Sequence, residues 1–276
     1  MNCLICNSVS EHYFSKDHSD YPGSPYKISL KVDYCKCKEC GFVFSRTHQE
    51  LDRGEWLELN SSWHHAFEKN GTTRKNNQPP YPEQALVLMI LNKNKIINLK
   101  DTLDYAAGYG TMANILFKYF GEEIKIYDEY VFDHNSEIQY IHKNSIKKYS
   151  LVVNSAMFEH ILKRQDLDCI NNLVENDGVL MLHTLVCENI PCDPNWFYLE
   201  PLVHTAFHTN KSMEILMKQW GYAASIYSPQ AKSWFLFKKD FPGIDRLENF
   251  VQMINIELQA NYFYYKNGFM DYWKGY

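Results

Sequence analysis

From Glu83 onward the sequence alternates short β-type runs with helical stretches, and this alternation limits the fold more than any other feature. It is typical of a parallel sheet whose two faces are covered by helices. The β-type runs are residues 102–107, 123–128, 138–142, 150–156 and 178–186. The helical stretches are residues 83–93, 111–120, 160–176 and 210–221, the last with Thr209 or Asn210 as N-cap and Gly221 as its stop.

Two more β-type runs follow, AASIYS at 223–228 and SWFLFKK at 233–239. Only PQAK separates them, which is too short for a parallel crossover, so we expect them to pair antiparallel. The prediction is an α/β fold with a doubly wound, seven-stranded, mostly parallel sheet.

A glycine loop joins the first β-type run to its helix. Asp104-Tyr-Ala-Ala-Gly108-Tyr-Gly110 lies where an open α/β sheet places a ligand against a helix N-terminus. The two glycines allow a sharp turn and a close approach of the backbone to the ligand. Asp128 lies 18 positions after Gly110, at the end of the next run, where a carboxylate can accept hydrogen bonds from both ribose hydroxyls. Together these residues indicate an adenosine-containing cofactor.

The identity of that cofactor depends on Asp104. Gly108-Tyr-Gly110-Thr-Met-Ala113 also satisfies the dinucleotide pattern G-x-G-x-x-G/A, so an NAD-dependent oxidoreductase is an alternative. A carboxylate leading into the loop would lie near a pyrophosphate and repel it. A sulfonium cofactor with an ammonium group is cationic and would instead be attracted by the Asp104 carboxylate.

These motifs resemble those of class I S-adenosylmethionine-dependent methyltransferases, which have a Rossmann-like fold. Asp104, Gly108 and Gly110 look like their first motif, and Asp128 looks like their ribose-binding acid. The segment NSAMFEH at 154–160 is similar to their fourth-strand segment. The resemblance covers about residues 85–240. It implies S-adenosylmethionine as cofactor, bound by Asp104, Ala106, Gly108, Gly110, Asp128 and Ser155.

Candidate catalytic residues follow from the same resemblance. Methyl transfer to a hydroxyl needs alignment and a proton acceptor, and histidine has a suitable pKa. We predict catalytic roles for Glu159 and His160 after the fourth strand, and for His204 in the insertion that follows the fifth. A capping or packing role is the alternative for His160, and a surface or structural role for His204 and its neighbour His208.

A catalytic metal ion is not expected from the sequence. Some relatives bind a divalent ion through Glu-x-x-Glu-His, and Ala156 stands where the first of those glutamates would be.

The N-terminus carries two CxxC pairs. Cys3 and Cys6 form the first, Cys37 and Cys40 the second, with 30 residues between them. Four thiolates at such spacings form a closed tetrahedral zinc site, so we predict a structural Zn²⁺ in a zinc-ribbon-like module. Cys35 is an alternative ligand. Packing as reduced, apolar cysteines is the alternative reading for all of them.

The combination of such a module with a methyltransferase domain resembles a bacterial group that modifies sugars and surface glycans. It implies O-methylation of a small molecule such as a nucleotide-linked sugar or a surface-glycan precursor. The net charge of −5 and the lack of a Lys/Arg run argue against the alternative of a zinc-ribbon RNA methyltransferase or nucleic-acid binder. A noncatalytic interaction protein is a further alternative.

Several aromatic side chains would line an acceptor pocket or pack in the core or in a homo-oligomer. They are Trp63, Trp196, Tyr198 and those of the tail at 262–273.

The expected organisation is a zinc-binding module at residues 1–50, a connecting region at 51–82, a catalytic domain at 83–240 and a helical, aromatic-rich tail at 241–276. The sequence starts without a signal-peptide pattern and contains no long apolar run, which predicts a cytoplasmic protein without a membrane span.

Overall fold

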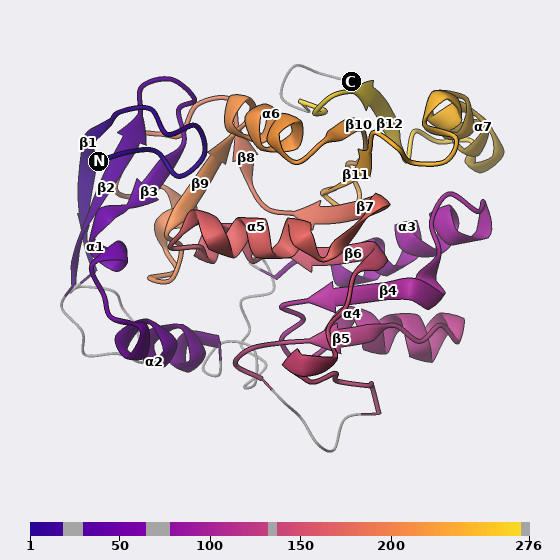
Figure 1. Cartoon of the computed structure of the whole chain (residues 1–276), viewed down its shortest axis with the longest axis horizontal. Helices are drawn as coiled ribbons and strands as arrows, with labels where there is room; N and C mark the ends of the chain where they lie inside the picture. Colours follow the sequence, from indigo (N-terminus) through magenta and orange to yellow (C-terminus); the bar gives the residue numbers. More distant parts are fainter. Residues whose placement is uncertain (19–29, 65–77, 132–136, 272–276) are drawn as a thin grey trace. The chain divides into compact units, whose positions relative to one another are not determined.

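The structure is a computed structural model that describes residues 1–18, 30–64, 78–131 and 137–271 (Figure 1). The chain forms two compact units. The first unit comprises Met1–Thr73, Phe158–Leu167 and Leu185–Leu216. The second comprises Arg74–Met157, Asp168–Thr184 and Met217–Tyr276.

The second unit contains a seven-stranded sheet in the order β12-β10-β11-β7-β6-β4-β5. In chain order its strands are β4 (Thr102–Tyr105), β5 (Lys125–Tyr127), β6 (Tyr149–Ser155), β7 (Val174–His183), β10 (Tyr222–Ser228), β11 (Ser233–Lys238) and β12 (Tyr264–Asn267). Strands β5, β4, β6 and β7 run parallel, and β10 and β11 form the predicted antiparallel pair. The α/β class and the positions of six strands are therefore as predicted.

The sheet is mixed, and the prediction of a mostly parallel sheet was wrong. Strand β11 pairs antiparallel with β7, and β12 pairs antiparallel with β10. Strand β12 comes from the tail at 241–276, which was predicted to be helical. The tail first forms helix α7 (Leu247–Leu258), and this helix returns the chain so that β12 adds to the exposed edge of β10.

The β-type run at 138–142 does not form a strand. It makes one isolated parallel bridge, between Tyr140 and Ile126 of β5. Two backbone hydrogen bonds accompany that bridge, one from the Ile126 amide to Gln139 and one from the Ile141 amide to Ile126. Strand β5 is only three residues long and the run continues into a 3-10 turn at Lys143–Ser145, so there is little edge for it to extend along.

Helices pack on the sheet because its central strands are continuous apolar runs. One core cluster joins Leu151 and Val153 of β6 and Phe235 of β11 to the helices α3 (Tyr81–Lys93), α4 (Thr111–Ile115) and α7. The intervening strand residues, including Val152 and Leu180, are also fully buried. Both faces of the sheet are therefore covered, as a doubly wound fold requires.

The remaining helices overlap the predicted stretches, but the stretch predicted at 160–176 is helical only over Arg164–Asn172, and its last residues, from Val174, belong to β7. Helix α4 continues as a π-helical turn at Leu116–Phe120, and α5 spans Arg164–Asn172. Helix α6 spans Asn210–Gln219 and is followed by Gly221 in the left-handed conformation at φ +73°. Short 3-10 turns lie at Leu99–Asp101, Phe158–His160, Phe197–Leu199 and Ile244–Arg246.

The first unit is built on a five-stranded sheet in the order β1-β2-β3-β9-β8. Its strands are β1 (Ser10–Asp17), β2 (Lys31–Cys37), β3 (Val43–Ser45), β8 (Val186–Cys187) and β9 (Ala206–Thr209), and its helices α1 (Arg46–Gln49) and α2 (Arg53–His64) follow β3. Phe14, Tyr34, Trp56 and Phe207 contribute to its aromatic core.

This sheet is formed by two chain segments that the sequence analysis assigned to different domains. Strands β1 to β3 belong to the predicted module at 1–50, whereas β8 and β9 come from the insertion within the predicted domain at 83–240. Because β3 pairs with β9, the cysteine-rich segment does not form a sheet of its own. None of the helices among the described residues is both long enough and apolar enough to cross a membrane.

Candidate functional site

The glycine loop in the second unit follows β4 and has an unusual backbone. Ala106, Gly108 and Gly110 all have positive φ, at +63°, +53° and +67°. The amides of Ala106 and Ala107 both donate to the Tyr127 carbonyl at the end of β5, at 2.8 and 3.1 Å. Left-handed residues at alternating positions turn successive amides toward one side, which is a geometry suited to binding an anionic or polar group.

Gly110 has room for no side chain. A Cβ atom there would lie 2.8 Å from Cδ1 of the buried Ile126. Gly110 also precedes α4 directly, so the loop ends on that helix. A side chain at this position would adopt a left-handed backbone and displace the Ile126 side chain, so glycine is favoured here for both backbone and packing reasons.

Asp128 fastens the glycine loop to the end of β5. Its Oδ2 atom accepts a hydrogen bond from the Gly108 amide at 2.8 Å. Its Oδ1 atom accepts from the amides of Tyr130 and Val131 at 2.8 and 2.9 Å. The Tyr140 hydroxyl donates to the Gly108 carbonyl at 2.8 Å, so the loop is held from both sides.

Asp104 lies within β4, directly before the loop, and its side chain is 3% exposed. Burial, and secondly the negative charge of Asp128, raise the pKa of Asp104 to about 8. Within the described part of the chain no hydrogen bond to this carboxyl is found. A buried acid of this kind favours a cationic ligand group, whose charge would restore the ionised form.

Ser155 ends β6, next to β4 in the sheet, and its hydroxyl donates to Oε1 of the buried Gln84 at 3.1 Å. Its neighbour Asn154 donates to the Tyr105 carbonyl at 3.0 Å and so ties the ends of β6 and β4 together. Gln84 comes from α3 and was not singled out in the sequence. The Ser155 hydroxyl thus has a structural partner, and a role toward a cofactor would fall to its backbone.

The predicted cofactor residues converge on one place in the second unit. Strand β4 lies between β5 and β6, and the strand order reverses there. Asp104, the loop and Asp128 all lie at the carboxyl ends of β4 and β5. This is the topological switch point at which open α/β sheets bind ligands.

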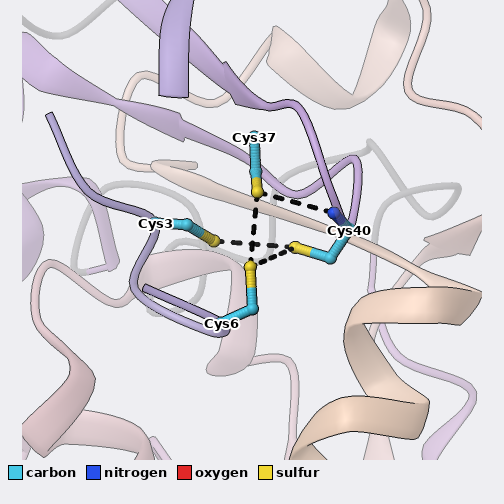
Figure 2. Close-up of side chains that lie close together, drawn as sticks. All are labelled: Cys3, Cys6, Cys37 and Cys40. Carbon is cyan, nitrogen blue, oxygen red and sulfur yellow. Dashed lines mark hydrogen bonds between the residues drawn. The ribbon is translucent and has the colours of Figure 1, made fainter. Parts of the chain in front are cut away.

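The four predicted zinc ligands come together in the first unit, with their sulfur atoms pointing toward one another (Figure 2). The sulfur atoms of Cys3 and Cys40 are 3.6 Å apart, those of Cys6 and Cys37 3.4 Å, and those of Cys6 and Cys40 3.7 Å. A tetrahedron with Zn–S bonds of about 2.3 Å has edges of about 3.8 Å. The donor set and spacing therefore fit a Zn²⁺ ion, and no ligand position is left open.

Backbone groups support this cluster. Asn7 and Gly41, each following a CxxC pair, are left-handed at φ +61° and +71°. The Ile5 amide donates to the Cys3 sulfur at 3.4 Å, and the Cys40 amide donates to the Cys37 sulfur at 3.5 Å. Amide donors of this kind stabilise thiolates and orient them for a metal ion.

Two residues outside the cysteine segment hold the cluster in place. Arg164 donates to the Ile5 carbonyl at 3.0 Å, and the Thr209 hydroxyl donates to the Cys40 carbonyl. Thr209 also caps α6, since its hydroxyl accepts from the Ser212 amide at 3.1 Å. Cys35 is not part of the cluster: it pairs with Phe44 across β2 and β3.

Glu159, His160 and His204 form a second cluster in the first unit, and their ligand-type atoms lie within 4.8 Å of one another. Glu159 is 3% exposed and accepts a hydrogen bond from the Tyr198 hydroxyl at 2.8 Å. The rings of His160 and His204 meet edge to face, with centroids 4.9 Å apart. The structure thus brings together the three predicted catalytic residues from two segments more than forty positions apart.

Other aromatic and histidine candidates are structural in this unit. His208 is fully buried between Phe42 and Phe158 and contacts the Phe158 carbonyl at 3.3 Å. Trp63 is 8% exposed and lies in the aromatic core. Trp196 packs against Tyr198 and Phe207. In the tail, Tyr272 and Trp273 lie outside the described residues.

No protein-family model matches the sequence, and no curated protein matches it. Among solved structures, the chain is similar to the plantazolicin methyltransferase BpumL in complex with SAH (TM-score 0.44, 11% identity, 67% of this chain and 96% of that one). It is similar to a Burkholderia thailandensis 1,6-didemethyltoxoflavin-N1-methyltransferase with bound S-adenosylhomocysteine (TM-score 0.44, 11% identity, 78% of this chain and 97% of that one).

A third similar structure is magnesium protoporphyrin IX methyltransferase from Synechocystis PCC 6803 with bound SAH (TM-score 0.36, 12% identity, 56% of this chain and 80% of that one). At TM-scores below 0.5 these likenesses carry no weight for the function of this chain.

Proposed function

We propose that the chain is an S-adenosylmethionine-dependent methyltransferase. The observation that carries the proposal is the left-handed loop Ala106–Gly108–Gly110 at the switch point of the sheet, fixed by Asp128 and preceded by the buried Asp104. The loop offers amides to the polar end of a cofactor, and Asp104 offers a negative charge to its ammonium group. A pyrophosphate at the same place would raise the pKa of Asp104 further and keep the buried acid neutral, so no opposite charges would pair there, which disfavours NAD.

The proposed reaction is an in-line displacement. The acceptor atom forms a bond to the methyl carbon, the carbon–sulfur bond breaks, and its electron pair stays on sulfur, which leaves S-adenosylhomocysteine. If the acceptor is a hydroxyl, its proton must also leave. We propose that Glu159, His160 and His204 act at the acceptor, where alignment of the reacting atoms provides most of the rate.

We further propose that the acceptor is a small molecule and that oxygen is methylated, with a nucleotide-linked sugar or another surface-glycan precursor as the first candidate. This choice is supported by the resemblance noted for a zinc module joined to methyltransferase motifs. Exposed Phe197, beside Trp196 and Tyr198, offers a ring on which an apolar sugar face can stack.

We propose that Cys3, Cys6, Cys37 and Cys40 bind a structural Zn²⁺. Zinc would hold the N-terminal segment to the sheet through Cys37, which ends β2, and Cys40, which lies in the turn between β2 and β3. A closed thiolate site contributes folding free energy and leaves no position for a substrate.

The decisive experiment is a binding measurement with the full chain. Isothermal calorimetry with S-adenosylhomocysteine should show one site, and NADH should show none. Binding of NADH without binding of S-adenosylhomocysteine would overturn the proposal in favour of an oxidoreductase. If cofactor binding is found, mass spectrometry of a panel of nucleotide sugars incubated with S-adenosylmethionine would detect a gain of one methyl group.

A further inference from the structure

The Glu159, His160 and His204 cluster has the composition of a metal site as well as of an acid–base site. Two histidines and one carboxylate are the protein ligands of many catalytic zinc and non-haem metal centres. The ligand-type atoms lie within 4.8 Å of one another, and bonds of about 2.1 Å to a common ion would require each atom to move by less than about 1 Å. We infer that these three side chains bind a divalent transition-metal ion distinct from the zinc at the four cysteines.

The histidine rings are oriented for this role by backbone carbonyls. Nδ1 of His160 lies 3.0 Å from the Val203 carbonyl, and Nδ1 of His204 lies 2.7 Å from the Tyr198 carbonyl. A carbonyl can only accept, so Nδ1 carries the proton in each neutral ring and Nε2 carries the lone pair. Metal-binding histidines are commonly fixed in this way, with the second nitrogen donating to a carbonyl or carboxylate.

The carboxylate has its own supporting partner. The Tyr198 hydroxyl donates to Oε1 of Glu159 at 2.8 Å and accepts from the Leu185 amide at 3.2 Å. Tyr198 therefore links the carboxylate to the backbone, and its carbonyl orients His204. One residue thus positions two of the three ligands.

The two segments that carry the ligands are fastened to each other. The Thr205 amide donates to the Glu159 carbonyl at 2.7 Å, and the Thr205 hydroxyl donates to the Ile161 carbonyl at 2.6 Å. Thr205 is 1% exposed. The spacing of the ligands is consequently set by the backbone as well as by side-chain packing, as a preorganised metal site requires.

Three protein ligands leave coordination positions open, whereas four thiolates leave none. An open position on this ion would accept an oxygen or nitrogen atom of the acceptor and lower its pKa. That role rests on the proposed function, but binding of the ion does not. The expected absence of a catalytic metal was based on Ala156 alone, and His204 supplies a third ligand from a distant segment.

The test is a titration of the full chain with Co²⁺ after removal of weakly bound metal. Thiolate-to-cobalt charge-transfer bands report occupancy of the cysteine site, whereas a His/His/Glu site gives only weak d–d bands. We expect the chain to bind a second equivalent of Co²⁺ with no increase in the thiolate-to-cobalt charge-transfer bands. Glu159→Gln and His204→Gln should each weaken that equivalent by at least about tenfold, and Tyr198→Phe by about 10- to 100-fold. The exposed His12→Ala is the matched control and should leave it unchanged.

Retention of the cysteine site in the variants shows that the first unit still folds, because both clusters lie in it. The inference is overturned if the chain takes up metal only at the cysteines, or if Glu159→Gln and His204→Gln both keep the second equivalent at unchanged affinity. S-adenosylhomocysteine calorimetry in parallel separates the two proposals. Cofactor binding without a second metal removes only this inference, and a second metal without cofactor binding removes only the proposed function.

Discussion

The carboxylate of Asp128 accepts a hydrogen bond from the Gly108 amide at 2.8 Å, so the acid predicted to bind ribose also holds the glycine loop in place. Its other oxygen accepts two further backbone amides in the turn after β5. A change at Asp128 would therefore remove the proposed ribose-binding carboxylate and also the hydrogen bond that holds the loop.

We accordingly expect Asp128→Ala to weaken S-adenosylhomocysteine binding by about 1–3 kcal/mol, because charge-assisted hydrogen bonds are lost. Calorimetry measures this change directly. Asp177→Ala, at an exposed position of β7 in the same unit, is the matched control and should have no effect. Unchanged affinity for the Asp128 variant would exclude this residue from the site.

The raised pKa of Asp104 makes binding depend on pH. With a pKa of about 8 instead of 3.8, the folded chain holds this proton more tightly than the unfolded chain. The group therefore stabilises the fold fully below about pH 4, and this contribution is lost as the pH rises toward 8.

A cationic ligand at Asp104 requires the ionised form, so its binding releases this proton below about pH 8. Affinity for S-adenosylmethionine should rise with pH, by up to about tenfold per unit between pH 6 and 8. Asp104→Asn should bind more weakly and lose most of the slope. Calorimetry in buffers of different ionisation enthalpy counts the proton, and equal slopes in both proteins would contradict the assignment.

Gly110 and Gly121 offer a matched pair of substitutions. Both have positive φ, at +67° and +70°. A Cβ atom added at Gly110 would lie 2.8 Å from Ile126, whereas one added at Gly121 would have no atom within 4 Å. Each alanine variant should lose about 1 kcal/mol or more for the left-handed backbone. Gly110→Ala should lose more, because Ile126 is fully buried, and should also weaken cofactor binding. Urea unfolding compares the two, and equal losses would argue against the packing explanation.

The cysteine cluster predicts about one tightly bound zinc ion per chain. Cys37→Ser should remove it and destabilise the first unit, whereas Cys35→Ala should retain it because Cys35 lies outside the cluster. Elemental analysis and thermal unfolding measure the two effects. Zinc-free protein prepared without chelators would refute the proposed ion.

His160 is expected to matter for turnover rather than for cofactor binding. Once an acceptor is known, His160→Ala should lower kcat at least about 10²-fold, whether the ring accepts a proton or holds a metal ion. Affinity for S-adenosylhomocysteine should stay nearly constant. Near-normal turnover in both His160→Ala and His204→Ala would remove these residues from the catalytic machinery.

Much of the secondary structure followed from local sequence pattern. Strand periodicity, the cap and stop of α6 and the four-residue link between β10 and β11 each depend on neighbouring residues, and the structure confirms them. The run at 138–142 failed because its apolar pattern reports burial, and Ile138 and Ile141 are indeed buried. Whether a buried run forms a strand depends on how long the neighbouring edge strand is, here the three residues of β5, and the sequence of the run itself does not contain that information.

The sequence by itself determined the four zinc ligand candidates and the glycine loop with its acids, because short spacings and backbone requirements such as a left-handed glycine are local. Only the tertiary structure decided that Cys35 is excluded, that β9 joins the sheet of the N-terminal segment, and that His204 meets Glu159 and His160. These contacts join residues far apart in the chain. They arise from strand pairing and from Thr205 fastening two segments, and such long-range packing leaves no periodic or spacing signal in a single sequence.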